Sequence, residues 1–320
     1  MRKLGAVLAA CCCGVLMMGM APVTVDESFP SYQRARGVSG SLKSMGSDTM
    51  NNVMAQLAAV FNRFYPNVQI EIEGKGSSTA PPALMENQAQ FGPMSRPMRS
   101  SEIDEFERRF GYPPTLLRIG IDCLAVYVHR DNPIREISMD QITRAFSVRG
   151  PDMTWGDLGV DEPGWADRPL SLYGRNSASG TYDFFKQFAL GGADFKSSVK
   201  EQPGSSGVVQ AVGRDRYAIG YSGIGYKTAA VRAVPVVVDG HAPASPDLQS
   251  ALSGEYPLAR FLLVYVNFDE RQGLDPLRRE FVRMVYSRQG QEAIIREGYY
   301  PVAPETARED LRKVGIEPSF

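Results

Sequence analysis

The sequence predicts an α/β protein built on largely parallel sheets. Segments with strand-type and helix-type patterns alternate from residue 38 to residue 129, which is the rhythm of consecutive βαβ units. The composition, with 43% hydrophobic and 22% charged residues, is that of an ordinary soluble globular protein. The 320 residues suffice for two modest lobes or for one large domain, so length alone does not decide between them.

The first half of the chain alternates cleanly between the two patterns. Its clearest helix is predicted over residues 50–65, where Val53, Leu57 and Phe61 fall on one face. Strands are predicted over 38–45, 68–72, 89–94 and 116–129, and further helices over 79–87 and 102–110.

The second half follows the same rhythm less cleanly. Strands are predicted over 170–173, 217–221 and 261–266, and helices over 180–190, around 208–212, and over 276–286 and 289–297. We expect the packed part to end at residues 299–301, because the tail that follows is polar.

The N-terminus has the pattern of an export signal. Arg2 and Lys3 precede an apolar run from Leu4 to about Val23, and residues 19–21 form a small-x-small cleavage pattern. We therefore predict a signal over 1–25, a polar linker over 26–37, and a periplasmic or extracellular location. Two alternatives stay open. Cys11 ends a lipoprotein-like box, and an apolar run of about 20 residues can serve as an uncleaved anchor.

Charge and residue counts exclude several classes of function. Lys and Arg number 35 against 36 Asp and Glu, so the basic excess expected of a nucleic-acid binder is missing. Cys123 is the single cysteine beyond the signal, and we expect it to be a small buried hydrophobe in a strand. The chain has two histidines, which gives metal clusters and histidine-based catalysis little support.

Three clusters of Ser, Thr and Gly each follow a predicted strand and open a helix. They occupy residues 46–49, 74–79 and 174–181. A helix start presents unpaired N–H groups and a partial positive charge, glycine lets the backbone approach, and hydroxyls add donors. The clusters therefore suit an oxyanion. The alternative is that each hydroxyl only caps its own helix.

Two arginines lie at the ends of predicted strands beside these clusters. Arg175 ends the strand that begins at Leu170, four residues before Ser179, and Arg96 ends another strand. A guanidinium can hold a phosphate through two parallel hydrogen bonds. The alternative for either arginine is a solvated position on the surface.

Several short motifs, in this order and spacing, carry a family resemblance. Residues 175–181 match an Arg-x-x-x-Ser-Gly-Thr loop, and residues 46–50, 76–79 and 95–96 match earlier motifs. Later matches are residues 217–221, 256–258, 287–291 and 298–301. From about Gly40 to Pro301 the chain resembles the phosphate-binding component of bacterial phosphate ABC transporters, in the type II-like family of periplasmic binding proteins.

The resemblance implies two α/β lobes that are joined by two crossovers and close over phosphate in a cleft. The crossovers would fall near Ile121 and Arg260, so that 38–120 and 261–320 form lobe 1 and 121–260 forms lobe 2. It also implies delivery of inorganic phosphate to an ABC transporter permease, and a monomer as the default state of the family. Met50 and Gly180 would contribute backbone N–H groups. The phosphate-binding residues predicted are Ser47, Asp48, Thr49, Met50, Ser77, Ser95, Arg96, Arg175, Ser179, Gly180 and Thr181.

One position departs from the family pattern. Some members have an aspartate where this chain has Arg96, and that carboxylate accepts the proton of a protonated phosphate, which rejects sulfate. We hypothesise that Asp48 has this role here while Arg96 and Arg175 supply charge. The alternative is that Asp48 caps a helix.

Two other functions stand as alternatives to phosphate binding. A protein of the same fold could bind molybdate or sulfate instead. A secreted phosphatase would need a metal cluster or an activated nucleophile beside a base, and the sequence suggests neither. We therefore expect no enzyme activity, no catalytic residue, no metal and no cofactor.

Overall fold

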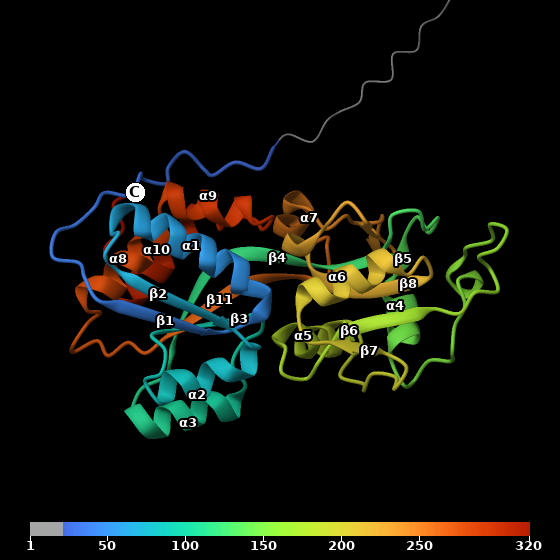
Figure 1. Ribbon diagram of the computed structural model, residues 1–320, viewed down its shortest axis with the longest axis horizontal. Helices are drawn as coiled ribbons and strands as arrows, with labels where there is room; N and C mark the ends of the chain where they lie inside the picture. The colour runs from blue at the N-terminus through green and yellow to red at the C-terminus, as the bar shows by residue number, and fades with distance from the viewer. Residues whose placement is uncertain (1–21) are drawn as a thin grey trace, which may run out of the picture.

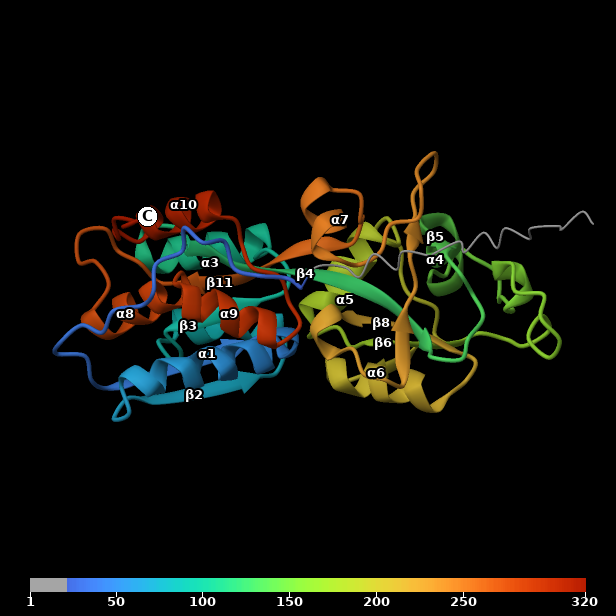
Figure 2. The same cartoon turned by 90° about the horizontal axis from the view of Figure 1, so that it is seen from above.

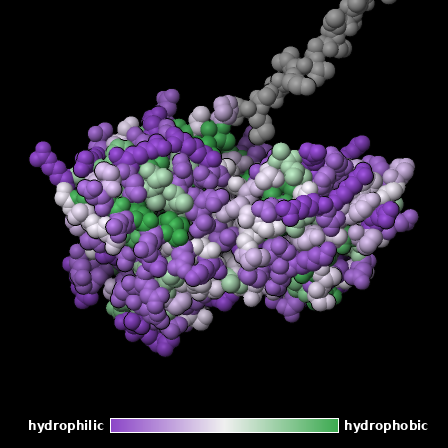
Figure 3. Space-filling model, in the orientation of Figure 1, coloured by the Kyte–Doolittle hydropathy of each residue, from purple (hydrophilic) through white to green (hydrophobic). Residues whose placement is uncertain are grey.

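The computed structural model describes residues 22–320, which form two lobes lying side by side (Figures 1 and 2). The export signal predicted at residues 1–25 and the lipoprotein box at Cys11 fall almost wholly outside the described residues. One long strand, β4 (Thr115–His129), runs from the first lobe into the second. Within residues 22–320, no helix combines the length and apolar character needed to cross a bilayer. The face shown in Figure 3 is largely hydrophilic.

The first lobe is a sheet covered by helices on both faces. Its strands stand in the order β2-β1-β3-β11-β4. Helices α1, α8, α9 and α10 pack on one face, and α2 and α3 pack on the other. The elements are β1 (Ser41–Gly46), α1 (Asn51–Phe64), β2 (Gln69–Gly74), α2 (Ala80–Met85), β3 (Phe91–Met94), α3 (Ser100–Phe110), β11 (Ala259–Val266), α8 (Pro276–Val285), α9 (Arg288–Arg296) and α10 (Pro304–Lys313), with 3-10 turns η1 (Asp48–Met50) and η2 (Ser77–Thr79).

The second lobe continues the sheet through β8, β6 and β7, with β9 also paired to β4. Apolar side chains of α4 and α5 pack in one cluster and those of α6 in another. The elements are β5 (Ile137–Ser138), α4 (Met139–Phe146), η3 (Gly156–Leu158), β6 (Ser171–Arg175), α5 (Gly180–Phe188), β7 (Lys200–Gln202), α6 (Ser205–Arg214), β8 (Ala218–Gly223), η4 (Ile224–Tyr226), β9 (Val231–Ala233), β10 (Val236–Val237) and α7 (Leu248–Ser253).

The two strands that cross between the lobes make the sheet mixed. β1, β2 and β3 pair in parallel, as do β6, β7 and β8, which confirms the predicted βαβ rhythm. β4 is antiparallel to β11 from Thr115 to Cys123 and antiparallel to β8 from Leu124 to Val128. The change of partner therefore occurs between Cys123 and Leu124. Cys123 is fully buried there, as expected.

Each lobe has its own hydrophobic core. The largest cluster of the first lobe gathers apolar residues between 25 and 119 and between 262 and 320. The largest cluster of the second lobe gathers residues between 123 and 259, together with Tyr300 at its edge. The boundaries at 120/121 and 260/261 stay predictions, because β4 and its ladder with β11 continue through the junction.

Both ends of the described chain are more closely packed than the sequence predicted. Phe29 and Tyr32, in the supposed linker, are buried, and the Tyr32 hydroxyl donates to Glu280 at 2.7 Å. The polar tail after Pro301 forms α10, which buries Leu311 and places Asp310 beside Arg118 at 2.7 Å. The expectation that packing ends at residue 301 was wrong. A short amphipathic helix with few apolar residues gives a weak hydrophobic pattern, and its charged contacts come from distant segments.

Candidate functional site

The three predicted Ser/Thr/Gly clusters meet where the lobes face each other. The Thr49 hydroxyl of lobe 1 lies 2.8 Å from the Thr181 hydroxyl of lobe 2. On the lobe 1 side, the Ser95 hydroxyl lies 3.0 Å from that of Ser47 and 3.3 Å from that of Ser77. All five residues are at most 1% exposed, so the cluster is closed off from solvent.

This convergence follows from the topology. Ser47 and Thr49 follow β1, Ser77 follows β2 and Ser95 follows β3, and the carboxyl ends of these parallel strands share one edge of the sheet. Thr181 lies in the first turn of α5, which follows β6 in the other lobe. In open α/β sheets, ligands bind at this edge. The residues brought together are hydroxyl donors and helix starts, which suit a tetrahedral oxyanion.

Two glycines allow the lobes to approach this closely. A Cβ at Gly180 would lie 2.3 Å from the Ser77 Oγ and 2.9 Å from the Ser95 Oγ. A Cβ at Gly76 would lie 2.4 Å from the Ala178 carbonyl oxygen, and Gly76 has a φ of 120°, which L side chains rarely adopt. Only glycine fits either position while the lobes are closed.

Arg175 supplies a buried positive charge to the same region. It ends β6 and is 1% exposed. Its Nη1 donates to the Ser205 hydroxyl at 2.6 Å, and its Nη2 donates to the Pro203 carbonyl at 3.1 Å. Among residues 22–320 the buried Nε has no hydrogen-bond partner. Burial lowers the pKa of Arg175, and the Asp48 carboxylate partly opposes that shift.

Asp48 joins the two lobes rather than capping the turn in which it lies. Its Oδ2 accepts from the Ser205 N–H, the first of helix α6, at 2.7 Å and lies 3.2 Å from the Arg175 Nη2. A carboxylate at a helix start interacts favourably with the helix dipole. Asp48 thus lies beside the buried arginine. Its role as acceptor for a phosphate proton stays a prediction.

Three other predicted residues have local contacts. The Ser179 hydroxyl accepts from the Thr181 N–H at 3.1 Å and so caps α5, which is the simpler role considered for it. The Met50 N–H donates to the Ser47 carbonyl at 3.2 Å. Gly180 is the first residue of α5. Contact of any of the three with an anion stays a prediction.

Arg96 is engaged by carboxylates. Its Nη1 donates to Glu102 at 2.7 Å, and its Nε lies 2.8 Å from Asp183 in the other lobe. Burial of Glu102 raises the pKa of its carboxyl, but hydrogen bonds from Arg96 and the Arg99 N–H outweigh that effect, and the net pKa is lowered. The charge of Arg96 is therefore matched within the protein. Its contribution to anion binding stays a prediction.

Sequence reasoning missed a buried ion pair and a serine at the site. Arg260 donates to Asp122 and to the Thr181 hydroxyl, each at 2.8 Å, while Ser205 contacts Arg175 as described. Asp122 interrupts an apolar strand that is buried on both faces, and this is a signal of a paired charge. Arg260 lies two residues after the Tyr-Pro-Leu motif at 256–258.

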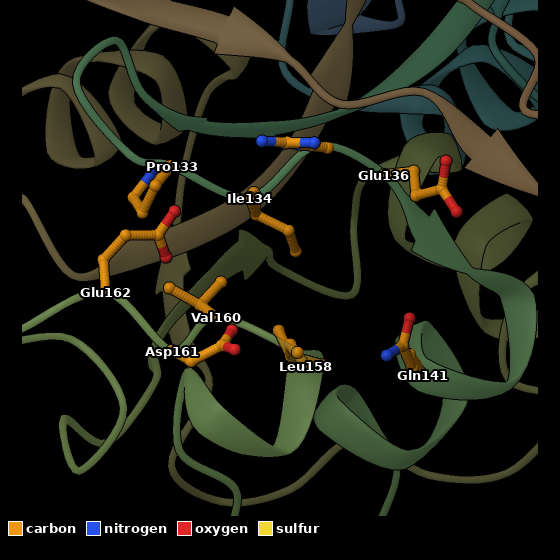
Figure 4. Close-up of a pocket in the computed structure, with 10 residues that line it drawn as sticks. Pro133, Ile134, Glu136, Gln141, Leu158, Val160, Asp161 and Glu162 are labelled. Atoms are coloured by element: carbon orange, nitrogen blue, oxygen red, sulfur yellow. The ribbon is translucent and has the colours of Figure 1, made fainter.

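A separate cavity of about 800 Å³ lies in lobe 2, away from this cluster (Figure 4). Figure 4 shows Glu136, Asp161 and Glu162 around it, and Arg135 is the one basic residue among those that line it. Three carboxylates against one guanidinium repel an oxyanion. The closed cluster between the lobes is therefore the candidate site.

Comparisons of sequence identify the family. Residues 33–289 match a family described as a PBP superfamily domain. The phosphate-binding protein PstS of Pseudomonas aeruginosa is 46% identical over 303 residues, which cover 92% of this chain and 94% of that protein. The PstS of Staphylococcus haemolyticus is 26% identical over 90% of this chain and 89% of its own length.

Solved structures are similar over most of the chain. A putative phosphate ABC transporter substrate-binding protein from Clostridium perfringens, solved with bound phosphate, has a TM-score of 0.71 at 25% identity. The match covers 82% of this chain and all of that one. An ABC-type phosphate transport receptor from Vibrio cholerae has a TM-score of 0.64 at 21% identity, which supports the fold alone.

Proposed function

The chain belongs to the PBP superfamily, and from this premise we propose that it is an exported solute-binding protein that captures inorganic phosphate between its lobes and delivers it to an ABC transporter permease. The observation that carries the proposal is Arg175. A guanidinium that is 1% exposed, with a buried Nε that lacks a partner among residues 22–320, lies beside a cluster of hydroxyls. A bound oxyanion would satisfy that donor.

The names of the relatives support phosphate as the anion. The protein from Pseudomonas aeruginosa that shares 46% identity is called a phosphate-binding protein, and the Clostridium perfringens structure holds phosphate. Energetics allow the assignment. Hydrogen bonds to charged groups contribute about 1.5–3 kcal/mol each. Micromolar binding needs about 8 kcal/mol, so a few such bonds suffice after lobe closure is offset.

We further propose that Asp48 favours phosphate over sulfate. Its Oδ2 already contacts Ser205 and Arg175, which leaves Oδ1 as the atom that would accept the proton of a protonated phosphate. Sulfate has no proton at neutral pH and would meet a carboxylate without a donor. Molybdate would meet the same obstacle, so this contact argues against the other oxyanions.

The remaining parts of the proposal follow from the family. Export, a monomeric state and a role without catalysis are typical of a binding component, and lobe 1 and lobe 2 would divide near residues 120 and 260. The phosphate-binding residues predicted from the sequence would act as ligands, and none of them is proposed to transfer a group.

Calorimetric titration of protein stripped of phosphate tests the function. We expect micromolar or tighter binding of phosphate, with no competition from sulfate or molybdate at about a hundredfold excess. The Asp48→Asn variant should bind phosphate more weakly and narrow the preference over sulfate. Stronger binding of another anion, or no binding of phosphate, would overturn the proposal. Unchanged selectivity in Asp48→Asn would overturn the role of Asp48 alone.

A further inference from the structure

A buried ion pair lies where the two crossover strands run beside each other. Arg260 on β11 and Asp122 on β4 are register partners in the antiparallel ladder. The Arg260 Nε and Nη2 donate to the Asp122 Oδ2 at 3.0 and 2.8 Å. The Asp122 side chain is 0% exposed and the Arg260 side chain 4%. Because Asp122 Oδ1 also accepts from the Ile224 N–H at 3.0 Å, both carboxylate oxygens are used.

The remaining donors of Arg260 reach both lobes. Its Nη1 donates to the Ser95 carbonyl in lobe 1 at 2.8 Å, and its Nη2 donates to the Thr181 Oγ1 in lobe 2 at 2.8 Å. The guanidinium is rigid and planar, so these contacts and the pairing with Asp122 constrain each other. Arg260 therefore has one orientation in the closed protein.

This contact fixes the direction of a short chain of hydroxyls. A guanidinium has no acceptor, so the Thr181 oxygen accepts from Arg260 and its own hydrogen points elsewhere. The Thr49 oxygen is 2.8 Å away. If Thr181 donates to Thr49, the hydrogen of Thr49 is left to donate to an anion or to the Ser205 Oγ, 3.5 Å away. If Thr181 turns to an anion, it donates directly. Either way the pair presents donors, which an oxyanion requires.

We propose that Arg260 is a positioning residue for anion binding: with Asp122 holding it at the crossover, it orients the hydroxyls of Thr181 and Thr49 as donors to the bound oxyanion. The proposal rests on the proposed function and adds two residues to it. Arg260 acts through Thr181 and does not need to touch the anion. A purely structural role of the ion pair would instead affect binding independently of the Thr181 hydroxyl.

A double-mutant cycle separates the two roles. Phosphate affinity is measured by calorimetry for the wild type, Arg260→Lys, Thr181→Val and the double variant. A lysine keeps the charge for Asp122 but lacks the fork that reaches Thr181. We expect each single change to weaken binding about tenfold or more, as for a lost hydrogen bond to a charged group. In the Thr181→Val background, Arg260→Lys should cost less than about threefold more.

Two further variants sharpen the test. Thr181→Ser keeps the hydroxyl, so the effect of Arg260→Lys should persist in that background. Arg118→Lys is the matched control, because Arg118 lies on β4 in the same ladder with β11 and pairs with buried Asp310 at 2.7 Å, away from the site. It should change affinity less than about twofold. If Arg260→Lys does not fold, the paired change Arg260→Gln with Asp122→Asn removes both charges together and takes its place in the cycle.

The outcomes are distinguishable. A wild type that does not bind phosphate would overturn the proposed function. A wild type that binds phosphate, together with equal costs of the Arg260 change with and without the Thr181 hydroxyl, would overturn the positioning role alone. The positioning role is supported if the Arg260 change weakens phosphate binding whenever the Thr181 hydroxyl is present and not when it is removed.

Discussion

Arg175 is held at the site by contacts that leave one donor unused. Asp48, Ser205 and the Pro203 carbonyl engage its two terminal nitrogens, while Nε has no partner among residues 22–320. A buried donor without an acceptor costs about 1–3 kcal/mol. An anion that accepts from Nε would remove that cost on binding. Binding of an anion at this position is therefore favourable.

Arg175→Lys tests that argument. The ammonium keeps a positive charge but cannot present the parallel donors of a guanidinium, so we expect phosphate binding to weaken about tenfold to a hundredfold. Calorimetry measures the change. Arg232→Lys is the control, because Arg232 is half-buried on β9 and donates to the Asn132 carbonyl. Unchanged affinity in Arg175→Lys would show that the arginine does not hold the anion.

Individual residues of the site could be predicted to very different degrees. The hydroxyl clusters and Arg175 were found from local patterns, because a strand, a turn and a helix start are encoded within a few residues. Arg260 and Asp122 were missed as site residues, since their pairing depends on the register of two strands 138 positions apart in the chain. Local patterns likewise could not predict that Arg96 pairs with Asp183 of the other lobe.

At the scale of elements, the first turn of α5 carries two different tasks. Its start brings Gly180 and Thr181 to the hydroxyl cluster, and Asp183 in the same turn reaches across to lobe 1. The Asp183 Oδ2 lies 2.8 Å from the Arg96 Nε and 2.5 Å from the Arg99 Nη2. Glu102, in the first turn of α3, holds Arg96 from the other side. These four side chains form an ion-pair cluster that links α3 to α5 across the lobes.

Asp183→Asn should therefore speed the release of phosphate. Removing one charge from a half-buried cluster leaves Arg96 paired with Glu102 but breaks one of several contacts between the lobes, so we expect dissociation to be about twofold to tenfold faster. Stopped-flow measurement of dissociation gives the rate, and the wild-type rate should rise with salt more than the variant's does. Asp194→Asn is the control, because Asp194 lies beyond the end of α5 and pairs with Lys186 of the last turn of α5, within lobe 2.

An unchanged release rate would mean that the ion-pair cluster does not hold the lobes together.

Elements themselves were predictable where their pattern is strong, as for α1 with its apolar face. α4 went unpredicted although Ser138 and Gln141 form a capping box and Ile142, Ala145 and Phe146 are buried. The helix is short, so it offers only two turns of pattern to read.

At the scale of the whole molecule, closure requires the backbone of one lobe to approach the other lobe with no Cβ between them. The Ser78 N–H donates to the Ala178 carbonyl across the lobes at 3.3 Å, close to where Gly180 faces Ser77. The family fold was predictable from the resemblance of several motifs, and the convergence of the hydroxyl clusters from helix starts that each follow a predicted strand. The closed geometry was not, since it depends on how two separately packed lobes fit each other.

Gly180→Ala should act as a wedge between the lobes. Its Cβ would lie 2.3 Å from the Ser77 Oγ and 2.9 Å from the Ser77 Cβ, so closure would require lobe 1 to move back. Gly180 begins α5 with a φ outside the left-handed range, and alanine favours a helix, so lobe 2 should fold normally. Small-angle scattering should show the wild type becoming more compact on adding phosphate and the variant staying open.

The matched control for the wedge is Gly207→Ala. Gly207 lies in the first turn of α6, and its added Cβ would meet Gln202 side-chain atoms at an ordinary 3.4 Å. That variant should close with phosphate as the wild type does, and its melting temperature should rise with phosphate by mass action. Gly180→Ala should lose most of this rise, because open lobes bind the anion from one side only. Full closure of Gly180→Ala would show that the Ser77 and Ser95 side chains can move aside, and that their contact with Gly180 does not limit how closely the lobes approach each other.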